Sequence, residues 1–203
     1  MAEPCLPLVY LPGASGRSQV WNAIAGKLAG RRPPVLVDYP GLAAAEVEPP
    51  LSTIDELAEH IASTLPERCD LAALSMGSSL ALRIALAHPT RIRRLVLVAA
   101  AGGVDVLGLG GIDWREPFLE RRPNAPRWFI DDTLDLTPQL SAIAIPTLLV
   151  FGDADLIAPV AVGEHMQRHL TNARLEIVAG GTHDLEEEQP DLLASLMEAH
   201  LRR

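Results

Sequence analysis

Aromatic residues are scarce in this chain, at 4% of its 203 residues, although hydrophobic residues make up 48%. The interior must therefore be built mainly from Ala, Leu, Val and Ile, and the length suits one domain with a substantial core. Only two cysteines are present, Cys5 and Cys69. Two thiols form neither a disulfide framework nor a metal-binding signature, so we expect both to be reduced and buried.

Basic residues are also in short supply, with 17 Lys and Arg against 26 Asp and Glu, for a formal net charge of −9. This charge disfavours a nucleic-acid partner, because phosphate backbones are bound by clustered Lys and Arg. The arginine pairs 31–32, 93–94 and 121–122 are scattered, which is typical of a solvated surface. No run of about 18 uncharged apolar residues predicts a membrane span, and residues 1–5 do not resemble a signal peptide. We therefore expect a soluble, cytoplasmic protein with no membrane partner.

Short apolar segments alternate with amphipathic ones, which predicts an α/β fold with a mostly parallel sheet flanked by helices on both faces. The expected strands are 7–11, 35–39, 71–74, 95–99, 147–151 and 174–178. The expected helices are 19–29, one that begins at a capping box of Ser52 and Asp55, 76–88, 160–170 and 191–201.

The alternation is broken between Gly102 and Thr137, a stretch rich in glycine and proline that holds two of the three tryptophans. We interpret residues 102–137, approximately, as a cap insertion over one end of the sheet. The whole chain, residues 1–203, is then a single domain.

The most informative segment is 70–82, which predicts a short strand, a tight turn with Ser75 at its tip, and a helix. Serine is a poor nucleophile and needs a neighbouring base. His183, in a loop after a strand, is the best candidate, and it needs an acidic partner in turn. Asp153 and Asp155 both follow a strand, and we choose Asp155 as the partner and Asp153 as a turn-forming residue. The chain order Ser…Asp…His is that of one hydrolase architecture.

These segments resemble the α/β-hydrolase fold superfamily, as a serine hydrolase with a small lid. Four segments carry the likeness: 73–77 resembles G-x-S-x-G, 152–159 resembles G-x-x-D-x-x-x-P, 181–183 resembles G-x-H, and 11–16 resembles the H-G-x-x-G oxyanion loop. Ala73 replaces the first glycine of the elbow, and Pro12 replaces the loop histidine. The likeness covers nearly the whole chain, except that the family's first two strands find no room before Leu8.

The resemblance implies a catalytic triad of Ser75, Asp155 and His183. It also implies an oxyanion hole formed by the backbone N–H groups of Met76 and Ala14. Asp105 is a weaker alternative acid, because some members of the family place the acid after the preceding strand. Such a reaction needs no metal and no organic cofactor.

Aromatic side chains of the insertion are candidates for one wall of an apolar substrate pocket: Trp114, Phe118, Trp128 and Phe129. We also expect the Met76 side chain to contact the acyl group, since it directly follows the nucleophile.

The leading functional hypothesis is a serine hydrolase that cleaves a carboxylic ester, thioester or lactone of a small molecule through an acyl-enzyme on Ser75. Two alternatives stay open: a cofactor-free lyase or perhydrolase with the same triad, and a non-catalytic binding protein with the same fold. Serine at the elbow argues against haloalkane and epoxide hydrolases, whose elbow carries Asp. Segment 35–39 is an expected sheet edge, so we expect a monomer or a weak homodimer.

Overall fold

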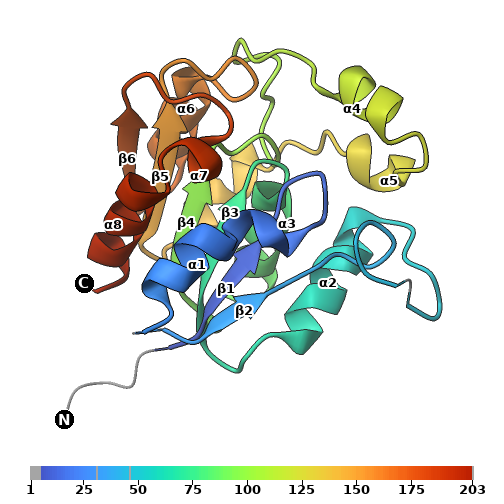
Figure 1. Ribbon diagram of the computed structural model, residues 1–203, viewed down its shortest axis with the longest axis horizontal. Helices are drawn as coiled ribbons and strands as arrows, with labels where there is room; N and C mark the ends of the chain where they lie inside the picture. Colours follow the sequence, from blue (N-terminus) through green and yellow to red (C-terminus); the bar gives the residue numbers. More distant parts are fainter. Residues whose placement is uncertain (1–5, 31, 46, 203) are drawn as a thin grey trace.

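The computed structural model describes residues 6–30, 32–45 and 47–202 (Figure 1). In this part of the chain, six parallel strands form one sheet in the order β2-β1-β3-β4-β5-β6. Their bounds are β1 Leu8–Leu11, β2 Pro34–Leu36, β3 Cys69–Leu74, β4 Ile92–Val98, β5 Thr147–Gly152 and β6 Ala173–Val178. The expected parallel α/β sheet is confirmed.

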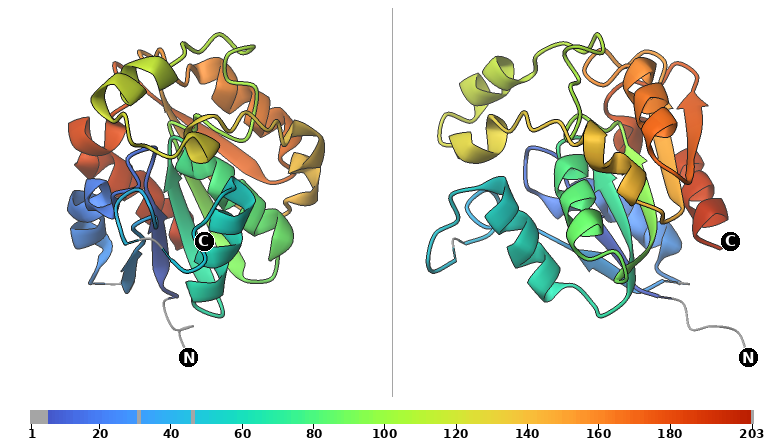
Figure 2. Two further views of the ribbon diagram at one scale, coloured as in Figure 1. Left: turned by 90° about the vertical axis from the view of Figure 1, so that its right-hand side faces the viewer. Right: turned by 180° about the vertical axis from the view of Figure 1, so that it is seen from behind.

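Helices cover both faces of the sheet (Figures 1 and 2). One face carries η1 (Ser18–Trp21), α1 (Asn22–Leu28), α7 (Leu185–Glu188) and α8 (Pro190–Leu201). The other face, toward the viewer in the right panel of Figure 2, carries α2 (Ile54–Thr64), α3 (Gly77–Ala87) and α6 (Val160–His169). Successive side chains of β1 point to opposite faces of the sheet. Leu8 and Tyr10 pack against the helices of the first face, and Val9 and Leu11 pack against those of the second. Burial on both faces explains why the strands are continuously apolar.

Two local expectations were wrong by a few residues. The capping box of α2 is formed by Thr53 and Glu56, not by Ser52 and Asp55, because the Thr53 hydroxyl accepts the N–H of Glu56. The second strand, expected at 35–39, is β2 and ends at Leu36. The N–H of Val37 still donates to the carbonyl of Tyr10 in β1. The next residues bond to the segment that follows β1 instead: Asp38 accepts the N–H of Ser18, and the N–H of Tyr39 donates to the carbonyl of Gly16. β2 is nevertheless an edge strand, as expected.

The segment between β4 and β5 lies beyond the carboxyl ends of the strands (Figure 1). It contains α4 (Arg115–Arg121), α5 (Arg127–Ile130) and η2 (Thr137–Ala142). The N–H of Leu136 donates to the carbonyl of Gly103 at 3.0 Å, so the two ends of the insertion lie side by side. Asp132 anchors it to α3, since its carboxylate accepts from Ser79 Oγ at 2.7 Å and from Arg83 Nη2 at 2.9 Å.

A buried charge network lies at the opposite end of the sheet. Asp70 of β3 is fully buried and accepts from Arg32 Nη1 at 2.5 Å and from Arg93 Nη2 at 2.7 Å. Both guanidinium groups also donate to the carbonyl of Leu201, the last residue of α8. The expectation that these arginines lie on a solvated surface was wrong for Arg32, which is 7% exposed.

Two further expectations concern the thiols and the membrane. Cys69 is a free, buried thiol, and Cys5 lies outside the described residues. No helix in the described ranges is long and apolar enough to cross a bilayer.

Asp70→Asn should lower the free energy of unfolding by about 3 kcal/mol, because it leaves the buried charge of Arg32 uncompensated. Urea denaturation followed by circular dichroism measures the change. Asp191→Asn is the matched control: it breaks the exposed ion pair with Lys27 and should cost less than about 1 kcal/mol. Equal losses for the two variants would contradict a structural role for the buried network.

Candidate active site

Ser75 stands at a left-handed turn between β3 and α3, with a φ of +51°. This conformation costs a non-glycine residue about 1–2 kcal/mol, so the surroundings must hold it. The N–H of Ser75 donates to the carbonyl of Val98 at 3.0 Å, and its own carbonyl accepts from Ser78 Oγ at 2.7 Å and from the N–H of Ala101 at 3.2 Å. These bonds fix the turn and direct the hydroxyl away from the sheet.

The loop after β1 is closely packed against this turn. A Cβ on Gly77 would lie 2.3 Å from the carbonyl oxygen of Pro12, so only glycine fits at that position. A Cβ on Gly13 would lie 3.2 Å from the Cβ of Ser75. The buried Tyr39 hydroxyl donates to the Pro12 carbonyl at 2.7 Å and fixes the loop from beneath.

The structure brings the three residues of the expected triad into one hydrogen-bonded chain. His183 Nε2 lies 2.9 Å from Ser75 Oγ, and His183 Nδ1 lies 2.8 Å from Asp155 Oδ2. The other oxygen of Asp155 accepts the N–H groups of Ile157 at 2.8 Å and Ala158 at 2.9 Å, and its side chain is fully buried. An acceptor at Nδ1 favours the tautomer with the proton on Nδ1, which leaves Nε2 free to accept from the serine hydroxyl.

The two other carboxylates considered at the sequence level have different partners. Asp153 Oδ1 accepts the N–H of Gly180 at 2.6 Å and joins the loop after β5 to the loop after β6. Asp105 Oδ1 accepts the N–H of Gly108 at 2.9 Å, within the insertion. Of these three carboxylates, only that of Asp155 hydrogen-bonds the imidazole of His183.

The backbone N–H groups of Met76 and Ala14 flank the serine, one next in sequence and the other in the loop that packs on it. Neither donates to an acceptor among the described residues. The Met76 side chain is fully buried, and a Cβ on Gly102 would lie 3.0 Å from its sulfur. It therefore lies beneath the turn and not in the pocket, contrary to our expectation for its side chain.

A pocket of about 360 Å³ opens over the serine hydroxyl. Its lining residues are Gly13, Ala14, Ser15, Val20, Leu74, Ser75, Trp114, Phe118, Arg121, Ile157, His183, Asp184, Glu186 and Glu187. Trp114 and Phe118 form the wall on the side of the insertion, with their rings edge to face at 5.5 Å. No group of three or more His, Cys, Asp or Glu within the described ranges is arranged to hold a metal ion.

The other two aromatic candidates lie elsewhere. Phe129 is fully buried and packs edge to face on Tyr39, with ring centroids 5.7 Å apart. Trp128 lines a separate hollow together with Pro40 and Leu51. The structure therefore places only Trp114 and Phe118, of the four, in the wall of the serine pocket.

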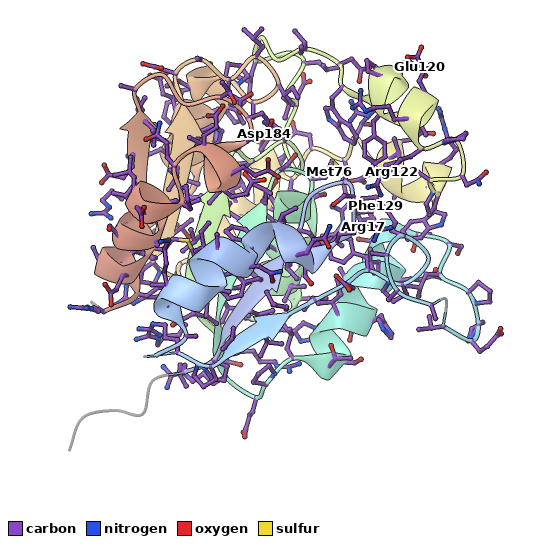
Figure 3. The ribbon with its side chains drawn as sticks, viewed as in Figure 1. Arg17, Met76, Glu120, Arg122, Phe129 and Asp184 are labelled. Carbon is purple, nitrogen blue, oxygen red and sulfur yellow. The ribbon has the colours of Figure 1, made fainter. Side chains whose placement is uncertain are left out.

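An arginine cluster adjoins the pocket and was not anticipated from the sequence. Arg17, Arg121 and Arg122 line a second hollow that shares Ala14, Phe118 and Arg121 with the serine pocket. Arg17 and Arg122 are labelled in Figure 3. Arg122 donates to the carbonyl of Ser15 at 3.3 Å, and its guanidinium lies 5.7 Å from the Phe118 ring centroid. None of the three pairs with a carboxylate of the described chain. Figure 3 shows Glu120 on the outer side of α4, away from this cluster.

Glu186 is the second unanticipated group. It is 5% exposed although it lines the pocket, and its Oε2 has no hydrogen-bond partner. Burial, with smaller contributions from Asp184 and Glu187, raises its pKa to about 7; a hydrogen bond from the residue's own backbone N–H and, to a lesser degree, His183 partly offset this rise. Three consecutive glutamates, 186–188, are typical of a solvated surface, so the sequence carries no signal for the buried one.

Glu186→Gln should stabilise the fold more at high pH than at low pH. The folded pKa is raised above 4.5 to about 7, so the folded state holds its proton more tightly than the unfolded state. The contribution of Glu186 to stability is therefore fully present below its pKa in the unfolded chain, and it is lost as the pH rises through its pKa in the folded protein. Thermal melts at about pH 5 and about pH 8 should show a larger gain in Tm for the variant at the higher pH. A gain that is equal at both would contradict the raised pKa.

Several curated proteins are similar in sequence to this chain. A "Pimeloyl-[acyl-carrier protein] methyl ester esterase" of Nitrosomonas europaea is 29% identical in an alignment that covers 83% of this chain and 84% of that protein. A protein of the same name from Neisseria meningitidis is 27% identical and covers 86% of each chain. These names agree with the expectation of a hydrolase that acts on ester bonds.

Solved structures share the fold. An esterase of Thermogutta terrifontis superposes with a TM-score of 0.78 at 21% identity, over 97% of this chain and 89% of that one. The meta-cleavage product hydrolase of Pseudomonas fluorescens superposes with a TM-score of 0.80 at 18% identity, over 97% and 90%. At these identities the likeness concerns the fold alone.

The family model described as "Alpha/beta hydrolase family" matches residues 8–144. This match spans more than half of the chain, from β1 through the elbow and the insertion. It agrees with the parallel sheet, with the left-handed turn at Ser75 and with the order of the strands. The chain belongs to the alpha/beta hydrolase family.

Proposed function

We propose that the protein is a serine hydrolase that cleaves a carboxylic ester through an acyl-enzyme on Ser75. The observation that carries this proposal is the hydrogen-bonded chain from Ser75 Oγ through His183 to the buried Asp155. A carboxylic ester is favoured over a thioester or a lactone because the curated relatives are named as methyl ester esterases.

The proposed reaction begins when Ser75 Oγ attacks the ester carbonyl while His183 Nε2 takes the hydroxyl proton. Asp155 stays ionised, holds the imidazole in the required tautomer and stabilises the imidazolium that forms. The carbonyl oxygen becomes an oxyanion beside the N–H groups of Met76 and Ala14, which are free to donate to it. Each such donor lowers the barrier by about 3 kcal/mol.

The tetrahedral intermediate then collapses. The bond between the carbonyl carbon and the alkoxy oxygen breaks, His183 returns the proton to the leaving alcohol, and an acyl-serine remains. Water enters, gives a proton to His183 and attacks the acyl carbon, and Ser75 leaves as a hydroxyl. The net reaction consumes one water and yields an acid and an alcohol.

Ser75→Ala should lower kcat for p-nitrophenyl acetate by about 10³-fold or more and abolish labelling by a fluorophosphonate probe. Circular dichroism should show an unchanged fold. Ser195→Ala is the control. The Ser195 hydroxyl donates a hydrogen bond to the carbonyl of Asp191 on α8 and does not line the pocket, so this variant should be labelled like the wild type.

Retained hydrolysis or labelling in Ser75→Ala would contradict Ser75 as the nucleophile. Failure of the wild type to react with any ester or probe would favour a non-catalytic protein. Product analysis also tests the chemistry, since hydrolysis releases one acid and one alcohol per ester consumed. A lyase or a perhydrolase would give other products.

Asp155→Asn should lower kcat by about 10⁴-fold, because an amide at this position favours the wrong histidine tautomer. Asp153→Asn is the matched control, because an amide oxygen still accepts the N–H of Gly180, and kcat should stay within about tenfold of the wild type. Steady-state kinetics on one p-nitrophenyl ester measures both variants. The reverse order of effects would assign the acid to Asp153.

A further inference from the structure

The arginine cluster of Arg17, Arg121 and Arg122 takes no part in the proposed reaction. The three side chains line one hollow of about 440 Å³, between the insertion and the loops after β1 and β2. Within the described ranges, the guanidinium groups of Arg17 and Arg121 have neither a carboxylate partner nor a hydrogen-bond acceptor. Neighbouring cations repel one another unless an anion neutralises them. The cluster therefore lacks a negatively charged partner.

This lack does not reflect a shortage of carboxylates, because the chain has 26 Asp and Glu against 17 Lys and Arg. Several other arginines have acidic partners, both in the insertion and on α3: Arg83 pairs with Asp55 and Asp132, Arg115 with Asp113, and Arg127 with Asp131. Surface charge alone thus does not account for three arginines around one hollow, and an external anion is the partner that fits.

The hollow is continuous with the serine pocket. Ala14, Phe118 and Arg121 line both. Ala14 is also the residue whose N–H is proposed to bind the oxyanion, so the arginines lie next to the position of the reacting carbonyl group. An ester attacked by Ser75 can therefore reach the arginines with its acyl or its alcohol substituent.

Arg122 is held in a fixed position at the edge of the hollow. Its Nη1 atom donates to the carbonyl of Ser15 at 3.3 Å, and its guanidinium lies 5.7 Å from the ring centroid of Phe118. Its other guanidinium nitrogens have no acceptor among the described residues. A guanidinium that is already oriented loses less conformational entropy when it binds an anion.

The charges of the serine pocket favour one orientation of a charged substrate. Asp184 and Glu187 line the part of the pocket next to α7, and both are exposed. Arg121 lines the part that α4 contributes. An anionic substituent is repelled by the two carboxylates and attracted toward the arginine hollow.

We propose that the arginine cluster binds an anionic group of the substrate, a carboxylate or a phosphate, while Ser75 attacks an ester bond of the same molecule. The inference rests on the proposed function, because it names the class of ester that Ser75 cleaves. Guanidinium groups suit this role, since their paired N–H groups match the oxygens of a carboxylate or a phosphate. The arginines then act as specificity-determining residues that select charged esters over neutral esters of the same size.

Two sets of matched esters test this selection, one for each side of the ester bond. On the acyl side, the mono-p-nitrophenyl ester of adipic acid and p-nitrophenyl 5-phosphonopentanoate are compared with the p-nitrophenyl ester of adipic acid monoamide. On the alcohol side, 4-acetoxybutanoate and 3-acetoxypropyl phosphate are compared with 4-acetoxybutanamide. A pH-stat assay gives kcat/KM for each ester. The readout is the ratio of an anionic ester to the amide of its set, in which general damage to the enzyme cancels.

In the wild type, this ratio should be about 10 or more in at least one set, as expected for hydrogen bonds to a charged group. The larger of the carboxylate and phosphate ratios identifies the preferred anion. The double variant Arg17→Gln/Arg121→Gln should lower the ratio about tenfold. Arg121→Glu, which reverses one charge, should lower it more than Arg121→Gln does.

Arg127→Gln is the matched control. Arg127 is an exposed arginine of the same insertion, but it pairs with Asp131 and lines neither the hollow nor the serine pocket. The variant changes the net charge as much as Arg121→Gln does, and it should leave the ratio unchanged.

A ratio near 1 in both sets for the wild type would overturn the proposal, as would a double variant whose ratio equals that of the wild type. Failure of the proposed function has a different signature: wild type and Ser75→Ala would be equally inactive on all six esters, and the assignment of a substrate class would fail with it.

Discussion

The left-handed turn at Ser75 is the constraint on which the rest of the site depends. The residue must be serine for its hydroxyl, yet its backbone adopts a conformation that favours glycine, at a φ of +51°. The turn therefore has to be held by its surroundings, through bonds to Val98, Ser78 and Ala101. Gly77 and the Tyr39 hydroxyl then bring the Pro12 carbonyl into contact with the turn. One strained residue thus explains much of the packing at this edge of the sheet.

Asp155 and His183 are positioned differently, by direct contact between the loop after β5 and the loop after β6. A Cβ on Gly152 would lie 2.1 Å from the carbonyl oxygen of Gly181, so the loops after β5 and β6 touch through their backbones. Asp153 adds a hydrogen bond to Gly180. Because these tethers fix both loops, the 2.8 Å bond between Asp155 and His183 needs little further ordering.

Sequence patterns predicted the features that depend on local chain geometry, namely the strands and the turn at Ser75. A strand followed by a turn and a helix located Ser75, and apolar segments of strand length located all six strands of the described sheet to within three residues. The capping box was misplaced by one residue: Thr53 and Glu56 match the preferred pattern of Ser or Thr followed three residues later by Glu, whereas Ser52 is followed by Asp55. The sequence did not predict the burial of Glu186, the arginine cluster or the position of Phe129. All three depend on how short helices are oriented relative to the sheet, and residue spacing does not predict that orientation.

The hydrogen bond between Leu136 and Gly103 has a consequence for how this fold can vary. It closes the base of the insertion, so β4 and β5 are joined at a fixed separation whatever the chain does in between. The entropy cost of a closed loop grows slowly with its length, by only about 0.6 kcal/mol for each doubling. A longer or shorter segment between Gly103 and Leu136 would therefore change the pocket wall of Trp114 and Phe118 at a small cost in loop entropy, while the sheet and the elbow stay in place.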